Sequence, residues 1–80
     1  MEKVFVGIDV SKNWLDVGII PLNQVKRFLY SDDDLVQLAD FTKSANPVLV
    51  VLEATGGLEM PLVSALAAEN LPVRIVNTGR

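Results

Sequence analysis

The sequence contains no cysteine and no histidine, and it has a single tryptophan. The two missing residue types exclude disulfides, thiolate or imidazole zinc sites, cysteine nucleophiles and Ser-His-Asp triads. The net charge of −3 argues against a general basic surface for nucleic acid, but it is compatible with carboxylates that bind a metal ion. No apolar run approaches the ~20 residues that span a bilayer, and the charged Glu2 and Lys3 stand where a signal peptide would become apolar. We therefore expect a cytoplasmic protein with no membrane partner.

Apolar residues, in contrast, make up 50% of the 80 residues. A chain of this length forms one small domain that buries only roughly 60–65% of its unfolded surface. The apolar fraction is higher than such a small domain needs, so we expect further chain to cover one side of it. Residues 1–80 are therefore predicted to be a truncated single domain.

Residues 4–20 are predicted to form a β-hairpin that carries an acidic residue, Asp9, where its first strand ends. Apolar residues alternate along 4–10, residues 11–13 are a polar turn, and 14–20 are apolar again. Residues 25–30 are predicted to be a third strand. Its Lys26 and Arg27 suit an edge strand, because charged side chains discourage pairing with another edge.

Two helices and two further strands are expected in the remainder. Ser31 and Asp34 resemble a capping box, and three consecutive aspartates favour a helix N-terminus over a metal cluster. This helix should run to about residue 44, with a buried face formed by Leu35, Leu38, Ala39 and Thr42. The unbroken apolar run 48–52 predicts a strand covered on both faces that ends at Glu53. A helix from residue 58 or 59, with Pro61 in its first turn and a stop at Asn70, should precede a strand over 72–77.

The predicted order is β-β-β-α-β-α-β. Right-handed crossovers place the last two strands parallel to the first, which gives a mixed five-stranded sheet in the order 3-2-1-4-5. This is the α/β, ribonuclease H-like arrangement. In it the ends of the first and fourth strands are neighbours, so Asp9 and Glu53 should meet at one edge of the sheet.

Two adjacent carboxylates without histidine or cysteine suit Mg²⁺ or Mn²⁺. In this topology they are typical of two-metal phosphodiester chemistry, although two carboxylates are too few to hold two ions, so others should follow Arg80. The alternatives are that Asp9 caps turn amides and that Glu53 is a solvent-facing residue at a strand end. Lys12 could contact a phosphate or be a solvated turn residue.

The remaining polar residues have similar alternatives. The Thr55-Gly56-Gly57 segment could approach a phosphate or serve only as a backbone turn. Asp16, Asp40 and Glu59 are expected to be solvated charges.

Three segments together resemble a known family: V-G-I-D-V-S-K at 6–12, L-E-A-T-G-G at 52–57 and V-R-I-V-N at 73–77. They resemble the N-terminal RuvC-like domain of DEDD-type insertion-sequence transposases, which are related to the pilin-gene inversion recombinase. The matches are in the family's order and cover essentially the whole sequence. Thr78 departs from the proline that the family often has after the asparagine.

The resemblance implies that Asp9 and Glu53 are the first two acids of a catalytic tetrad for Mg²⁺-dependent DNA strand cleavage and exchange. The other two acids and a catalytic serine would follow Arg80, so these 80 residues alone should be inactive. It further implies DNA as partner, a homo-oligomer and, as in some members, a structured guide RNA. Nucleic-acid contacts are assigned to Lys12, Thr55 and Gly56.

Two other functions stay open. Sugar kinases and actin share this core and also begin G-I-D, and there Asp9 would help to hold Mg²⁺–ATP. In a non-enzymatic interaction domain, both acids would be structural.

Overall fold

The structure is a computed structural model that describes residues 2–53 and 55–77. It contains the strands β1 (Phe5–Val10), β2 (Trp14–Ile20), β3 (Gln24–Leu29), β4 (Leu49–Glu53) and β5 (Val73–Val76), and the helices α1 (Asp32–Ser44) and α2 (Met60–Ala68). The order of elements is the one predicted from the sequence, and the boundaries differ from the prediction by at most two residues.

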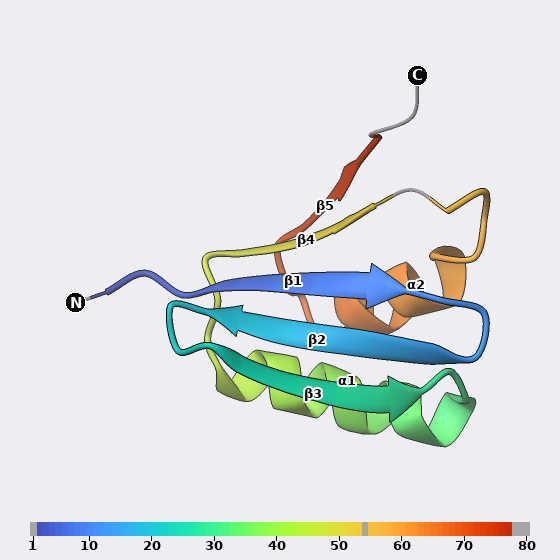
Figure 1. The fold of residues 1–80 in the computed structure, drawn as a ribbon, viewed down its shortest axis with the longest axis horizontal. Coiled ribbons are helices and arrows are strands. Elements are labelled where there is room, and N and C mark those ends of the chain that lie inside the picture. The colour runs from blue at the N-terminus through green and yellow to red at the C-terminus, as the bar shows by residue number, and fades with distance from the viewer. Residues whose placement is uncertain (1, 54, 78–80) are drawn as a thin grey trace.

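The five strands form one sheet in the order β3-β2-β1-β4-β5 (Figure 1). β1 pairs antiparallel with β2 and parallel with β4, and β4 pairs parallel with β5. β3 is therefore an edge strand, as its Lys26 and Arg27 suggested. The predicted ribonuclease H-like sheet is confirmed.

The hydrophobic core lies on one face of this sheet, where both helices pack (Figure 1). Alternate residues of each central strand point into it, because successive side chains of a strand face opposite sides. The most deeply buried members, all fully enclosed, are Leu15, Val17, Leu38, Val50, Leu62 and Leu66. We call this the helix-covered face and the other the open face.

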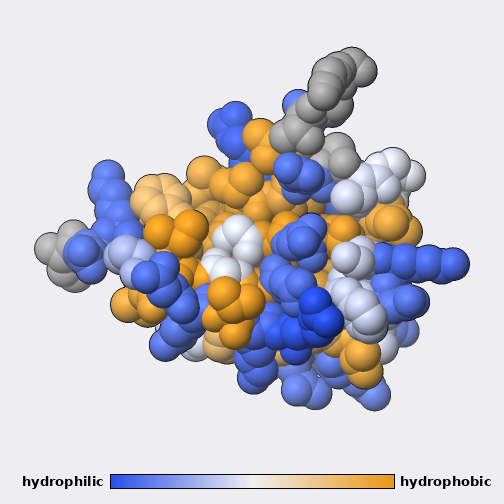
Figure 2. All heavy atoms as spheres, viewed as in Figure 1, coloured by the Kyte–Doolittle hydropathy of each residue, from blue (hydrophilic) through white to orange (hydrophobic). Residues whose placement is uncertain are grey.

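The prediction that the fourth strand is covered on both faces is wrong for the described residues. Val50 and Leu52 are buried, whereas Leu49 and Val51 are only partly so. Both helices lie on the other side of the sheet, so the open face keeps apolar side chains in contact with solvent. Val25 is 75% exposed there, and Figure 2 shows apolar residues interrupted by charged ones across this face.

Local signals set the helix boundaries. Ser31 is the N-cap of α1, and its hydroxyl accepts a hydrogen bond from the Asp34 N–H at 3.3 Å. The capping box is only half formed, because the Asp34 carboxylate accepts from the Leu29 N–H at 2.8 Å instead of returning to Ser31. α2 has Pro61 in its first turn, and Asn70, with φ of 59°, follows its last turn. Neither helix among the described residues has the length and apolarity needed to cross a membrane.

Candidate functional site

Asp9 and Glu53 stand at the carboxyl ends of the neighbouring strands β1 and β4. The parallel ladder between these strands ends at the pair Ile8 and Leu52, and the two acids are the next residue on each strand. Since Ile8 and Leu52 point into the core, Asp9 and Glu53 point to the open face. Both acids line the same hollow of about 630 Å³ on the open face.

Both carboxylates are available for a ligand. Within residues 2–53 and 55–77, no hydrogen bond or ion pair engages Asp9 or Glu53, and both residues are exposed. The amide of Ser11 donates to the Trp14 carbonyl at 3.0 Å, so it is not capped by Asp9. Mg²⁺ binds proteins through one or two carboxylates and completes its shell with water or phosphate oxygens. The pair therefore fits part of a Mg²⁺ or Mn²⁺ site, although the described residues hold no cluster of three potential metal ligands.

A third acid, Asp16, faces the same hollow but is neutralised. Asp16 is on β2, where it is directly opposite Asp9 of β1 on one side and Arg27 of β3 on the other. Arg27 donates two hydrogen bonds to its carboxylate, from Nε at 2.7 Å and from Nη2 at 3.0 Å. These bonds lower the pKa of Asp16 and raise that of Arg27. Glu53, Asp9, Asp16 and Arg27 thus form a row across four strands, which we call the acidic row.

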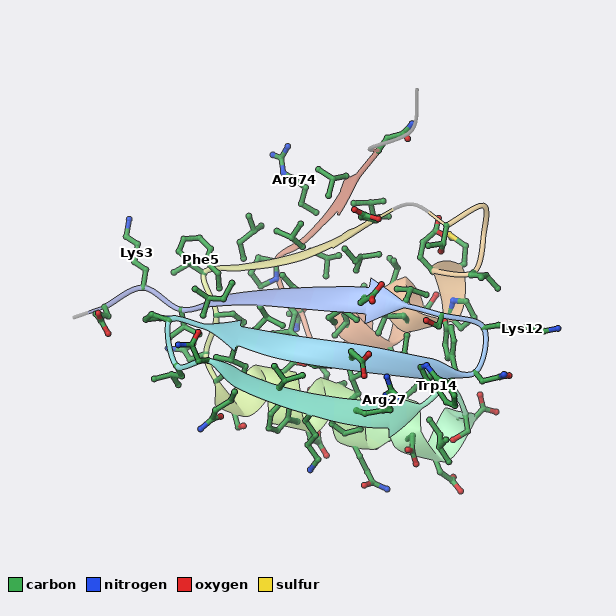
Figure 3. The ribbon with its side chains drawn as sticks, viewed as in Figure 1. Lys3, Phe5, Lys12, Trp14, Arg27 and Arg74 are labelled. Atoms are coloured by element: carbon green, nitrogen blue, oxygen red, sulfur yellow. The ribbon has the colours of Figure 1, made fainter. Side chains whose placement is uncertain are left out.

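Trp14 holds Arg27 in this position. The guanidinium carbon lies 4.6 Å from the centre of the indole ring, a cation–π distance, and Figure 3 shows the two side chains together on the open face. Sequence reasoning treated Asp16 as solvated. The ion pair could have been detected from the spacing of Asp16 and Arg27 on consecutive antiparallel strands. The short turn of residues 21–23 sets the register that places the two residues opposite each other.

The segment that follows Glu53 is organised by Glu59, which is only 8% exposed. Its Oε1 accepts hydrogen bonds from the Thr55 N–H at 2.9 Å, the Thr55 hydroxyl at 2.8 Å and the Gly57 N–H at 3.2 Å. These bonds, led by the one from the Thr55 amide, lower the pKa of Glu59 to about 2. The expectation that Glu59 is a solvated charge is wrong. Gly56 and Gly57 adopt φ values of 65° and 105°, which other residues rarely adopt.

Glu59 therefore occupies donors that a phosphate would need. The Thr55 amide and hydroxyl face this carboxylate and not the hollow that Asp9 and Glu53 line. Gly56 is exposed beside them. The assignment of Thr55 and Gly56 to nucleic-acid contact stays a prediction.

Lys12 lies apart from the acidic row. It lines a smaller hollow of about 310 Å³ together with Tyr30, Ser31 and Gly57, and Figure 3 shows its side chain pointing away from the molecule. Its predicted contact with nucleic acid would therefore be made beside, and not within, the hollow of the two acids.

Tyr30 was not identified from the sequence. Its hydroxyl donates to the carbonyl of Leu58 and accepts from the N–H of Leu62 at 3.2 Å, so it joins the start of α1 to the first turn of α2. Burial raises the pKa of this phenol. An interior tyrosine usually finds a partner for its hydroxyl, but the sequence does not say which one.

No protein-family model and no curated protein matches the sequence. Among solved structures, the chain is similar to T. thermophilus RuvC, determined in complex with a Holliday junction substrate, with a TM-score of 0.74 and 13% sequence identity. The similarity covers 96% of this chain and 66% of the RuvC chain, so the chain spans slightly less than two thirds of that protein. At this identity the comparison establishes the fold, which is RuvC-like.

Proposed function

We propose that residues 1–80 are the N-terminal part of the catalytic domain of a transposase or site-specific recombinase that cleaves and exchanges DNA strands. Asp9 and Glu53 are its metal ligands, and Mg²⁺ or Mn²⁺ is its cofactor. The observation that carries the proposal is the position of these two free carboxylates at adjacent strand ends, on one face of a RuvC-like sheet.

The chemistry of this pair suits phosphodiester cleavage. Divalent ions bound there would polarise the phosphoryl oxygens and lower the pKa of an attacking water. The chain's own contribution is to hold two carboxylates on neighbouring strands, exposed to an open hollow that DNA can approach. Gly7 and Gly18 line the hollow beside the acids and carry no side chain, so neither position obstructs the approach to the carboxylates.

The resemblance to insertion-sequence transposases narrows the proposal from DNA cleavage to transposition. The motifs around Asp9 and Glu53 support it, as does the order of strands that brings the two motifs together. A homo-oligomer and a guide RNA belong to the same proposal.

The test uses the full-length protein with Asp9→Asn and Glu53→Gln, each of which keeps the side-chain shape and removes the charge. We expect either change to reduce Mg²⁺-dependent cleavage of a four-way DNA junction or a linear duplex by about 10²-fold or more. Binding of Mn²⁺, followed by electron paramagnetic resonance, should weaken in parallel. Melting temperatures should stay close to wild type, because neither carboxylate makes a hydrogen bond or a close ion pair with another described residue.

Matched controls are Asp40→Asn on the exposed side of α1 and Glu2→Gln before β1. Each makes the same chemical change away from the acidic row, and neither should alter cleavage. Cleavage that survives in both Asp9→Asn and Glu53→Gln would disprove the proposal. Tight binding of Mg²⁺–ATP without any effect of DNA would instead favour the kinase-like alternative.

A further inference from the structure

We infer that Glu59 is a positioning residue for Glu53: it fixes Thr55 and Gly57, which follow β4, and thereby sets where the Glu53 carboxylate stands for the metal. The inference rests on the proposed function, because it assigns a role toward the same site. It concerns a residue that neither lines the hollow nor reaches the metal ligands directly.

Glu53 is held by the sheet on one side only. It pairs with Val76 of β5, but the ladder to β1 has already ended at Ile8 and Leu52. Figure 1 shows β4 diverging from β1 toward its carboxyl end. The next fixed point along the chain is Thr55, two residues after Glu53, and it is fixed by Glu59.

The bonds to Glu59 account for both polar groups through which Thr55 can donate. The Thr55 amide and hydroxyl lie 2.9 and 2.8 Å from one carboxylate oxygen, and the Gly57 amide lies 3.2 Å from the same oxygen. Hydrogen bonds to an ionised acceptor are roughly twice as strong as neutral ones. The segment therefore has a charged centre around which it folds, in a place only 8% open to solvent.

Glu59 is itself anchored, which makes it a fixed reference. It is the N-cap of α2, and its carbonyl accepts from the Val63 N–H at 2.9 Å in the first turn. Leu62, three residues after Glu59, is fully buried in the core. Rigid placement thus passes from the core through α2 and Glu59 to Thr55, the second residue after Glu53.

The role proposed for Glu59 is that of the residues that orient metal ligands in other proteins. Changing a group that orients a ligand typically costs 10–100-fold in metal affinity or activity. A positioning residue should therefore raise the metal concentration needed for activity while leaving the rate at saturating metal nearly intact. A purely structural residue should change the melting temperature without this separation.

The experiment measures Mn²⁺ binding alone and the Mg²⁺ dependence of DNA cleavage in the full-length protein. For Glu59→Ala we expect metal affinity to fall about 10-fold or more, with the cleavage rate restored at high metal. Glu59→Gln keeps one carbonyl acceptor and should restore most of the affinity. The control Glu69→Ala removes a carboxylate at the other end of α2, where it pairs with Lys43 at 3.0 Å, and should bind metal as wild type does.

A milder pair guards against loss of folding in Glu59→Ala. Thr55→Val removes the hydroxyl donor at nearly constant shape, and Thr55→Ser keeps it. We expect weaker Mn²⁺ binding for valine and unchanged binding for serine. Equal metal affinity in the two Glu59 and the two Thr55 variants, with wild-type cleavage still dependent on metal, would overturn the inference alone. A wild type that neither binds Mn²⁺ nor needs metal would overturn the proposed function and this inference with it.

Discussion

The two faces of the sheet are built from the same strands and have opposite properties. On the helix-covered face, residues such as Leu15 and Val17 are completely enclosed in the apolar core. On the open face, the residues next to them in the sequence form the acidic row, with two free carboxylates and one ion pair. Because successive residues of a strand face opposite sides of the sheet, each strand places residues that stabilise the core on one face and residues that can bind a ligand on the other.

This separation has a physical reason. Carboxylates buried among aliphatic side chains would have to give up hydration at large cost. Placed on the open face, Asp9 and Glu53 keep water or a metal as partners, while their strand neighbours Ile8 and Leu52 hold the sheet to the helices. Substitutions on the two faces should therefore affect different measurements.

The largest effect should come from Leu15→Ala on the helix-covered face. Leu15 is 0% exposed, and truncation of such a residue leaves a cavity that costs about 2–5 kcal/mol of unfolding free energy. Val25→Ala on the open face, where the side chain is 75% exposed, should change it by less than about 0.5 kcal/mol. Urea unfolding of both variants checks this. Similar losses would mean that the open face is covered in solution.

A smaller effect, of opposite sign, is expected from Thr42→Val in α1. Thr42 is 0% exposed, and its hydroxyl has no hydrogen-bond partner among the described residues. Replacing the unsatisfied hydroxyl by a methyl group of similar size should stabilise the fold by about 1 kcal/mol. The same urea titration measures it, with Thr42→Ser as the variant that keeps the hydroxyl and loses the methyl. A less stable valine variant would show that the hydroxyl has a partner.

The smallest effect on stability should follow Arg27→Gln on the open face, because the Arg27–Asp16 pair is exposed. The change should raise the pKa of Asp16 toward its ordinary value, since the hydrogen bonds from Arg27 are the main cause that lowers it. A carboxyl group whose pKa is lowered in the folded state stabilises the fold when the pH is above its ordinary, unfolded-state pKa. This stabilisation is lost as the pH falls through the folded-state pKa. The variant should therefore lose less stability on acidification.

Carbon-13 NMR of the Asp16 carboxyl measures this pKa. Lys26→Gln is the control, because Lys26 is the next residue on β3 but lies over the rings of Phe28 and Phe41 at 5.2 and 5.3 Å. It removes the same charge and should leave the pKa of Asp16 where it is. An unchanged pKa in Arg27→Gln would mean that the ion pair is not formed in solution.

Patterns within single elements made most of the fold predictable. Alternating apolar residues located the hairpin, Ser31 located the start of α1, and crossover handedness then fixed the strand order. The adjacency of Asp9 and Glu53 followed from that order. None of these inferences needed a contact between distant side chains.

What the sequence could not supply depends on such contacts. Glu59 looks like any charged residue near a helix start until the loop brings Thr55 and Gly57 to it. The full cover predicted for β4 failed for a related reason, because an unbroken apolar run does not say on which faces helices pack. Local sequence patterns indicate the helices and strands, whereas the burial of a charged residue such as Glu59 depends on how these elements pack together.

The bridge made by Tyr30 has a consequence for hydrogen exchange. Amides in the first turn of a helix normally lack a partner and exchange rapidly with solvent deuterium. The Leu62 amide instead bonds to the Tyr30 hydroxyl, which belongs to the corner between β3 and α1. Its deuterium uptake should therefore be slow. The uptake of this one amide should report whether the corner between β3 and α1 separates from α2.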